Sequence, residues 1–224
     1  MNRIRLLPSH LVDQIAAGEV IERPASALKE LVENALDAGA TQIIIDITDG
    51  GVSSISVSDN GCGMNAEELS LAAKRHATSK LPAANLFEIK SFGFRGEALP
   101  SIAAVSDLQI SSRIETLEHG WKIRIEHGDI YAPEPVACAV GTTVSVRDLF
   151  DKIPARRKFL KTQRTESGQC LEVVKQLAMA TPDVSFIFTD TGKTLLNLPA
   201  RTDEDSAIRD RLSDVMGHVF AKEA

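Results

Sequence analysis

Two polar side chains separated by one helical turn are the first candidates for chemistry in this sequence. Glu30 and Asn34 lie four residues apart in the segment PASALKELVENALDA (24–38), and therefore on one face of a helix. A carboxylate there could take a proton from water, and an amide oxygen could ligate a hard cation such as Mg²⁺. Mg²⁺ needs only one or two protein oxygens when phosphates and waters supply the others. A solvated helix surface is the alternative interpretation of the same pair.

A second candidate directly follows a segment of alternating polarity, in the string DNGCGM (59–64). The carboxylate of Asp59 would stand at a strand end, before glycines that permit close approach of another group. In that position it could accept a hydrogen bond from the exocyclic amine of a nucleobase. An ordinary Asn-Gly turn is the alternative.

A glycine-containing loop that leads into a helix, GFRGEAL (93–99), could bind phosphate through successive backbone N–H groups. The string HATSK (76–80) precedes it and offers hydroxyls and a cation that could close over phosphates. A mobile polar loop is the alternative. The chain contains no GxxxxGK[ST], HExxH or GxSxG string, so a P-loop, a zinc protease site and a serine nucleophile are not indicated.

Basic residues are concentrated in one segment of an otherwise acidic chain. The net charge is −6, from 25 Lys and Arg against 31 Asp and Glu, which disfavours coating of nucleic acid by the whole surface. Within the segment 151–164, DKIPARRKFLKTQR, six basic residues stand against one acid: Lys152, Arg156, Arg157, Lys158, Lys161 and Arg164. This segment could follow the phosphates of DNA, or it could be a solvated helix flank.

Length and composition indicate a globular intracellular protein. A chain of 224 residues with 43% hydrophobic and 25% charged residues can bury roughly 70% of its unfolded surface. Its longest apolar run has five residues (136–140), whereas a membrane span needs roughly 20. Asp13 and Glu19 disfavour a secretory signal. The three cysteines (Cys62, Cys138 and Cys170) are odd in number and widely spaced, so they predict no disulfide framework.

The elements that must position these residues follow from hydrophobic periodicity. Apolar residues at 28, 31, 32, 35 and 36 predict a helix over 24–38, between Pro24 and Gly39. Strands are predicted over 41–48, 54–59, 108–113, 121–128, 142–150, 184–189 and 194–199. Further helices are predicted over 65–76, 98–104, 166–179 and 203–216, with Pro100 expected to delay or kink the second of these. This order predicts an α+β sandwich with a mixed, mostly antiparallel sheet and helices on one face.

Four strings in one order, ELVEN, DNGCGM, GFRGEAL and GTTVSV (141–146), resemble the GHKL (Bergerat) ATPase fold of DNA gyrase B subunits, heat-shock chaperone ATPases and histidine kinases. Within that group the chain resembles the N-terminal domain of the MutL mismatch-repair family. The strings that carry this closer resemblance are QIAAGEVIERPAS (14–26), ELVENALDAGA (30–40), RHATSK (75–80), GFRGEAL and PARRKFL (154–160). It implies a GHKL ATP-binding domain over 1–200, with 201–224 starting the connection to a second domain absent from this chain.

The resemblance also implies roles for individual residues. Glu30 would be the general base that activates water against the γ-phosphate of ATP, and Asn34 would ligate Mg²⁺ and so help to bind the nucleotide. Asp59 would bind the adenine amine, with Gly63 allowing approach of the base and Thr143 helping through a water. The lid around the phosphates would contain Thr78, Ser79, Lys80, Gly93, Phe94, Arg95, Gly96 and Glu97. The DNA-contacting surface would include Arg156, Arg157, Lys158 and Lys161.

The implied function is a Mg²⁺-dependent ATPase that converts ATP slowly to ADP and phosphate and acts as a conformational switch in DNA mismatch repair. ATP would order the lid and pair two MutL-type protomers through an arm before Ser26. The other implied partners are a MutS-type mismatch-recognition protein and DNA, bound largely without sequence preference, and no membrane. The location would be the cytoplasm or nucleoid of a bacterium, or the nucleus of a eukaryote.

Turnover by this chain is expected to be weak, because ATPases of this type receive a phosphate-sensing lysine from the following domain. Two alternatives stay open. One is another GHKL ATPase, such as a type II topoisomerase subunit. The other is a nucleic-acid-binding module with an incomplete ATP site.

Overall fold

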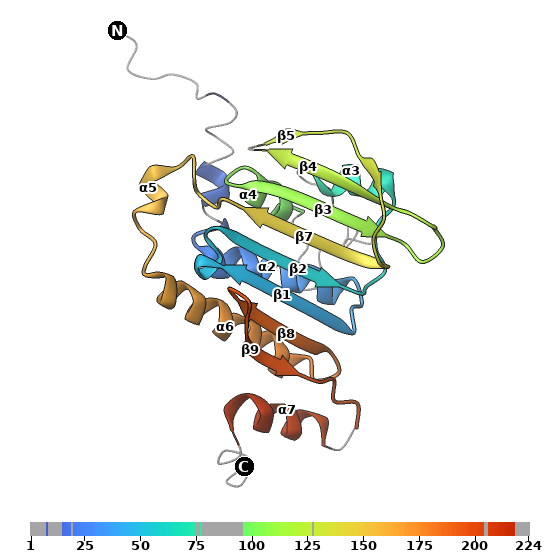
Figure 1. Cartoon of the computed structure of the whole chain (residues 1–224), viewed down its shortest axis with the longest axis vertical. Coiled ribbons are helices and arrows are strands. Elements are labelled where there is room, and N and C mark those ends of the chain that lie inside the picture. The colour runs from blue at the N-terminus through green and yellow to red at the C-terminus, as the bar shows by residue number, and fades with distance from the viewer. Residues whose placement is uncertain are drawn as a thin grey trace, which may run out of the picture.

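A computed structural model describes residues 8, 15–18, 20–74, 77, 96–126, 128–203 and 206–217. One large sheet faces the viewer in Figure 1, with most of the helices behind it and the C-terminal helix below it. The helices are α2 (Pro24–Asp37), α3 (Ala66–Ala72), α4 (Ala98–Ala103), α5 (Pro154–Arg157), α6 (Gln163–Ala180) and α7 (Ala207–Met216), with a 3₁₀ turn η1 (Asp49–Gly51). None of the helices in these ranges combines the length and apolarity that crossing a membrane requires.

Nine strands form a single sheet within the described residues. They are β1 (Gln42–Thr48), β2 (Ser54–Asp59), β3 (Asp107–Arg113), β4 (Gly120–Glu126), β5 (Asp129–Ile130), β6 (Glu134–Val136), β7 (Gly141–Arg147), β8 (Ser185–Asp190) and β9 (Lys193–Leu198). Their order is β5-β4-β3-β7-β2-β1-β8-β9, with β6 paired to β4. Among these strands only β1 and β8 pair in parallel, so the predicted mixed, mostly antiparallel sheet is confirmed.

The two faces of the sheet differ in burial because side chains alternate along each strand. In β1, Ile43, Ile45 and Ile47 are fully buried, whereas Ile44 and Asp46 are exposed. The buried side chains face the helices, since α2 packs against β2 and α6, and α6 packs against β8. The sheet therefore has one face covered by helices and one open face.

Several element boundaries agree with the periodicity and a few do not. α2 begins at Pro24 and ends at Asp37, close to the predicted limits. α3 has the expected capping box at Asn65 but ends at Ala72, before residue 76. The expected delay of α4 is wrong: the helix begins at Ala98 and holds Pro100 in its first turn, where an N–H has no intrahelical partner to lose. The short elements α5, β5 and β6 were not predicted.

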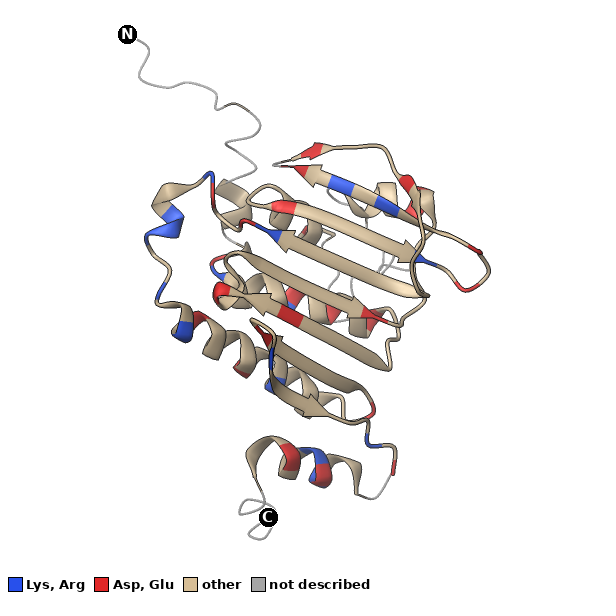
Figure 2. Ribbon diagram, in the orientation of Figure 1, with Lys and Arg blue, Asp and Glu red and all other residues tan. Residues whose placement is uncertain are grey.

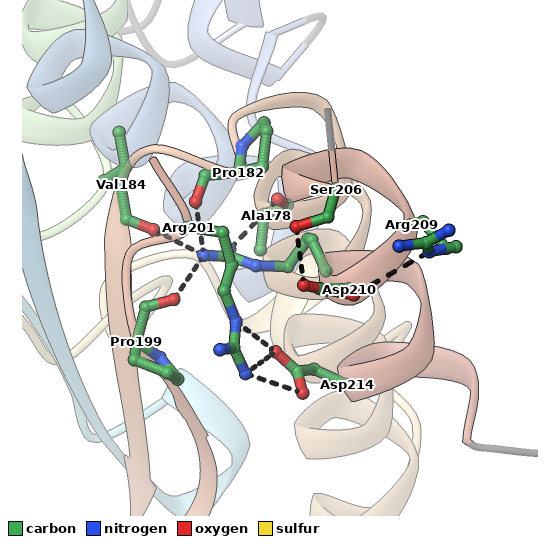
Figure 3. Close-up of polar contacts among 10 residues, drawn as sticks. Ala178, Pro182, Val184, Pro199, Arg201, Ser206, Arg209, Asp210 and Asp214 are labelled. Carbon is green, nitrogen blue, oxygen red and sulfur yellow. Dashed lines mark hydrogen bonds and ion pairs between the residues drawn. The ribbon is translucent and has the colours of Figure 1, made fainter. Parts of the chain in front are cut away.

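Helix α7 is anchored to the rest of the fold by one buried cation. Arg211 is fully buried, and its guanidinium donates hydrogen bonds of 2.8–3.1 Å to four main-chain carbonyls, as Figure 3 shows. These carbonyls belong to Ala178, Pro182, Val184 and Pro199. Arg201 pairs with Asp214 of α7 at 2.8 Å nearby. The described part of the segment 201–224 thus packs on α6 and on the segments before β8 and after β9, and the domain boundary at residue 200 remains a prediction.

Candidate functional site

The end of β2 presents a carboxylate on the helix-covered face of the sheet. Asp59 has the same parity as the buried Ile55 and Val57, so its side chain points toward the helices. Its Oδ1 accepts a hydrogen bond of 2.8 Å from the backbone N–H of Gly61. Burial raises the pKa of Asp59 above its ordinary value, and backbone hydrogen bonds from Gly61 and Thr142 partly offset this shift. The result is a fixed acceptor between the sheet and the helices.

Asn60 fastens the loop that follows Asp59 to the neighbouring strand. Its Oδ1 accepts hydrogen bonds of 2.9 Å from the N–H groups of Thr41 and Gln42, and its Nδ2 donates to the Thr41 hydroxyl at 2.8 Å. The amide therefore uses both ends to bind the start of β1. The Asn-Gly string is thus more than a turn, and Asn60 is a positioning residue that the sequence analysis did not name.

The same loop contacts the C-terminal end of α2, the helix that carries Glu30 and Asn34. The N–H of Cys62 donates to the carbonyl of Ala38 at 3.0 Å, and the N–H of Ala38 donates to the carbonyl of Asn34 at 3.0 Å. A Cβ on Gly61 would lie 2.7 Å from the Ala38 carbonyl oxygen, so glycine is required for this approach. Glu30 and Asn34 are both half-buried. The fold thereby joins the loop after Asp59 to the helix of the other candidate pair.

Two glycines let main-chain segments cross close to Asp59. Gly63 has a φ of 70°, and a Cβ there would overlap the main chain of Arg113 at the end of β3. Its observed contact is therefore with the protein, and its proposed contact with a base stays a prediction. Gly141 has a φ of 108°, and a Cβ there would overlap the main chain of Asp59. Gly141 is thus a second glycine that shapes the site.

The two threonines of the GTT string lie on opposite faces of the sheet. The β2–β7 register places Thr142 opposite Asp59 and Thr143 opposite Ser58. The hydroxyls of Ser58 and Thr143 are 2.9 Å apart on the open face. The register does not fit the predicted place of Thr143 in the base site and favours Thr142, because strand alternation turns Thr143 away from Asp59. The sequence contains a signal for this difference. Val144 is apolar and buried, and side chains two residues apart in a strand share a face, so Thr142 lies on the buried face with it.

Most of the predicted lid lies outside the described residues, namely Thr78, Ser79, Lys80, Gly93, Phe94 and Arg95. Gly96 is described, with a φ of 62°, and a Cβ there would lie 2.5 Å from the carbonyl oxygen of Ala77. Glu97 is the N-cap residue of α4, and its carbonyl accepts from the N–H of Ser101 at 2.9 Å. The RHATSK and GFRGEAL strings therefore meet at Ala77 and Gly96, while their role around phosphates remains a prediction.

The basic segment divides into one internally bonded arginine, Arg156, and five exposed cations. Figure 2 shows Lys and Arg along α5 and at the start of α6. Arg156 donates to the Ile21 carbonyl at 2.9 Å, lies 5.8 Å above the Phe150 ring, and occupies the space a Cβ on Gly18 would need. Arg157 pairs with Asp151 at 2.7 Å. The exposed cations are Lys152, Arg157, Lys158, Lys161 and Arg164. Solvent and a large anion can reach these five side chains more readily than that of Arg156.

Metal and thiol chemistry find little support among the described side chains. Within those ranges no group of three or more His, Cys, Asp and Glu residues is arranged to hold a metal ion. Burial raises the pKa of the Cys170 thiol to about 12, which keeps it protonated near neutral pH. Cys170 therefore packs in the core, whereas Cys62 is exposed.

A hollow of about 280 Å³ lies at the same end of the sheet but mainly on its open face. Its lining includes Ile44, Ser58, Ser111 and Thr143, whose side chains all point away from the helices. Asp59 and Thr142 also line this hollow, although strand alternation turns their side chains toward the other face. We therefore place the functional site between the sheet and α2 and not in this hollow.

An acceptor at the end of β2, a helix with Glu30 and Asn34 beside it, and this sheet order define the class of GHKL-type ATPase domains. The family model for histidine kinase-, DNA gyrase B-, and HSP90-like ATPases matches residues 21–133. The chain is 51% identical over 211 residues to the DNA mismatch repair protein MutL of Rhizorhabdus wittichii, and 52% identical over 214 residues to that of Azorhizobium caulinodans. These matches cover 93% and 96% of this chain but 35% and 34% of the relatives.

Solved structures agree with these relatives. The Aquifex aeolicus MutL ATPase domain complexed with ADP is 34% identical, with a TM-score of 0.73 over 88% of this chain and 70% of that one. The N-terminal domain of a DNA repair protein has a TM-score of 0.75 at 32% identity, over 92% and 60% of the two chains. The chain therefore belongs to the MutL mismatch-repair branch of the GHKL ATPases. It spans about a third of the length of the curated relatives it matches.

Proposed function

We propose that this chain is the ATP-binding, slowly hydrolysing part of a MutL-type conformational switch in DNA mismatch repair. The observation that carries the proposal is the carboxylate of Asp59, held by main-chain donors at the end of β2 and facing the helix that bears Glu30 and Asn34. The ADP complex of the similar Aquifex aeolicus domain supports the binding of a nucleotide by this chain.

The base half of the site fits an adenine. Asp59 would accept a hydrogen bond from the exocyclic amine, because an ionised carboxylate only accepts and the amine of adenine only donates. The hydroxyl of Thr142 lies next to it in the sheet register. Gly61 and Gly141 keep the surrounding main chain close without side chains in the way.

The phosphate half of the site is proposed from α2. The amide oxygen of Asn34 would ligate Mg²⁺, which when bound neutralises phosphate charge and takes most of its other ligands from phosphates and water. Glu30 would accept the proton of the attacking water. One turn of helix separates the two residues, so each can act on a different part of the same triphosphate. The lid formed by Thr78, Ser79, Lys80 and residues 93–97 would close over it.

The switch would work by coupling nucleotide binding to assembly. The free energy of binding ATP would stabilise a closed lid and a pair of protomers, and hydrolysis would return both to the open state. A second MutL-type protomer, a MutS-type protein and DNA are the proposed partners, and the bacterial relatives support a cytoplasmic site of action. Similarity to MutL proteins along most of the chain disfavours the topoisomerase alternative.

Calorimetric titration of the chain with ADP and Mg²⁺ tests the base site directly. We expect binding by the unsubstituted chain and a loss of at least about tenfold in affinity for Asp59→Asn, because an amide N–H replaces one acceptor. Ser58→Ala, which changes the preceding residue of β2 on the open face of the sheet, serves as the neighbouring control. Equal affinities for the unsubstituted chain and Asp59→Asn would refute the assignment.

A further inference from the structure

A buried hydroxyl next to the base site joins three separate segments of the chain. Ser112, on β3, is fully buried, and its Oγ accepts a hydrogen bond of 2.8 Å from the N–H of Met64. It donates to the carbonyl of Gly141 at 3.0 Å and lies 2.9 Å from the hydroxyl of Thr142. The loop after β2, the end of β3 and the start of β7 therefore meet at one oxygen atom.

The number of protons at this oxygen decides the direction of the bond to Thr142. A serine hydroxyl has one proton and two lone pairs. The Gly141 carbonyl can only accept, so the proton of Ser112 goes there, and the bond between the two hydroxyls must be donated by Thr142. The Thr142 hydroxyl is then left with only lone pairs for any other partner.

Thr142 and Asp59 face the same side of the sheet as direct neighbours in the β2–β7 register. We propose that Ser112 is a positioning residue that holds the Thr142 hydroxyl as a second acceptor beside Asp59, so that the site prefers a 6-amino purine over a 6-oxo purine. This inference rests on the proposed nucleotide site and assigns a determinant of its base preference.

The chemistry of the two bases explains the preference. Adenine carries an N–H donor on the group at position 6, whereas hypoxanthine carries a carbonyl oxygen there. Two acceptors, the Asp59 carboxylate and the Thr142 lone pairs, pair with the amine and leave the oxo group without a donor. A buried polar group without a partner is costly, so the oxo base is disfavoured. Without Ser112, the Thr142 hydroxyl can rotate and donate to the oxo group.

The experiment compares the affinities for ADP and IDP by calorimetry with Mg²⁺ present. We expect the unsubstituted chain to bind ADP roughly tenfold or more tightly than IDP. Ser112→Ala should reduce this ratio of affinities severalfold, because the Thr142 hydroxyl can then donate a hydrogen bond to the base where it otherwise accepts one. Thr142→Val should reduce the ratio similarly. Because Ser112 acts through Thr142, Ser112→Ala added to Thr142→Val should change the ratio no further.

Controls separate this inference from a general loss of packing and from failure of the site itself. Ser111→Ala changes the adjacent residue of β3 on the open face and should leave the ratio as it was. Equal loss of ADP and IDP affinity in Ser112→Ala, with the ratio kept, would mean that Ser112 only supports the fold and would overturn the proposal.

If Ser112→Ala does not fold, the similarly sized Ser112→Cys, whose thiol is a weak donor and acceptor, tests the same ratio. A ratio unchanged in Ser112→Cys and in Thr142→Val would also overturn the proposal. Failure of the proposed function looks different: the unsubstituted chain would bind neither nucleotide, or Asp59→Asn would bind ADP as well as the unsubstituted chain does.

Discussion

Arg156 and Ile21, 135 positions apart in the sequence, are joined by a hydrogen bond of 2.9 Å from the guanidinium to the main-chain oxygen. This bond ties the basic α5 segment to the stretch that leads into α2. The first arginine of the PARRKFL string thus has an internal partner, whereas Arg157, Lys158 and Lys161 are exposed. The string therefore combines a structural contact with a candidate surface for DNA.

The two kinds of basic residue should respond differently in a DNA-binding assay. Replacing Arg157, Lys158 and Lys161 together by alanine should weaken the salt dependence of DNA binding. The slope of the logarithm of the binding constant against the logarithm of the salt concentration should become less steep by up to about 0.9 per lost phosphate contact. Arg156→Ala should leave that slope unchanged and lower the free energy of unfolding by about 1–3 kcal/mol, because the Ile21 carbonyl loses its donor. Salt-dependent DNA titrations and urea unfolding measure the two effects. A flatter slope in Arg156→Ala alone would contradict this division.

Asp59 should make nucleotide binding and stability depend on pH in opposite ways. Burial raises its pKa, so the carboxyl binds a proton more tightly in the folded than in the unfolded chain. Its contribution to stability therefore falls as pH rises from the ordinary aspartate pKa of about 3.9 through the raised value. We expect Asp59→Asn to melt above the unsubstituted chain at pH 7, and this advantage to vanish at acid pH.

Binding of ADP requires the ionised carboxylate, so affinity should decline on acidification, beginning at a higher pH than for a solvated aspartate. Calorimetry over a pH series gives the midpoint. A pH-independent affinity between about pH 4 and 7, a range that starts at the ordinary carboxyl pKa and extends above it, would exclude Asp59 as the acceptor.

Substitutions of Glu30 and Asn34 should have different effects on catalysis and on binding, although the two residues are only one helical turn apart. Glu30→Ala should retain Mg²⁺–ATP binding and reduce turnover by about 10²-fold or more, since it removes a general base. Asn34→Ala should weaken Mg²⁺–ATP binding as well as turnover. Steady-state phosphate release and titration with a non-hydrolysable analogue distinguish the two. Loss of binding in Glu30→Ala with normal binding in Asn34→Ala would reverse the assigned roles.

Arg211 should be among the most sensitive positions outside the site. Arg211→Ala leaves four main-chain carbonyls without their buried donor, so we expect a loss of at least about 3 kcal/mol of unfolding free energy. Arg209→Ala, on the same helix but largely exposed, should cost less than about 0.5 kcal/mol. Urea unfolding measures both. Similar losses in the two variants would show that α7 contributes through helix formation alone.

Periodicity was sufficient to predict α2 and most of the long strands, because each buries one regular set of apolar side chains. The short strands could not be predicted in this way, because β5 has two residues and β6 has three, too few to show a hydrophobic period. Arg211 could not be predicted as buried, since its partners are backbone carbonyls from three distant segments that composition does not reveal.

Sequence motifs were sufficient to propose the candidate site, but they did not show on which face of the sheet each side chain lies. Asp59 follows from its place at a strand end. The choice between Thr142 and Thr143 depends on strand parity, and a string match ignores parity. Asn60 and Ser112 act through hydrogen bonds to Thr41, Met64 and Gly141, contacts that only the folded register brings together.

The parallel pairing of β1 with β8 has a consequence for synthesis of the chain on the ribosome. Gln42 pairs with Ser185, so β1 and its partner are separated by 143 residues (185 − 42). At roughly 5–20 residues per second, about 7–30 s pass between the emergence of the two strands. Until then one edge of an isoleucine-rich strand has no neighbour, and nascent chains on one messenger could pair there with each other.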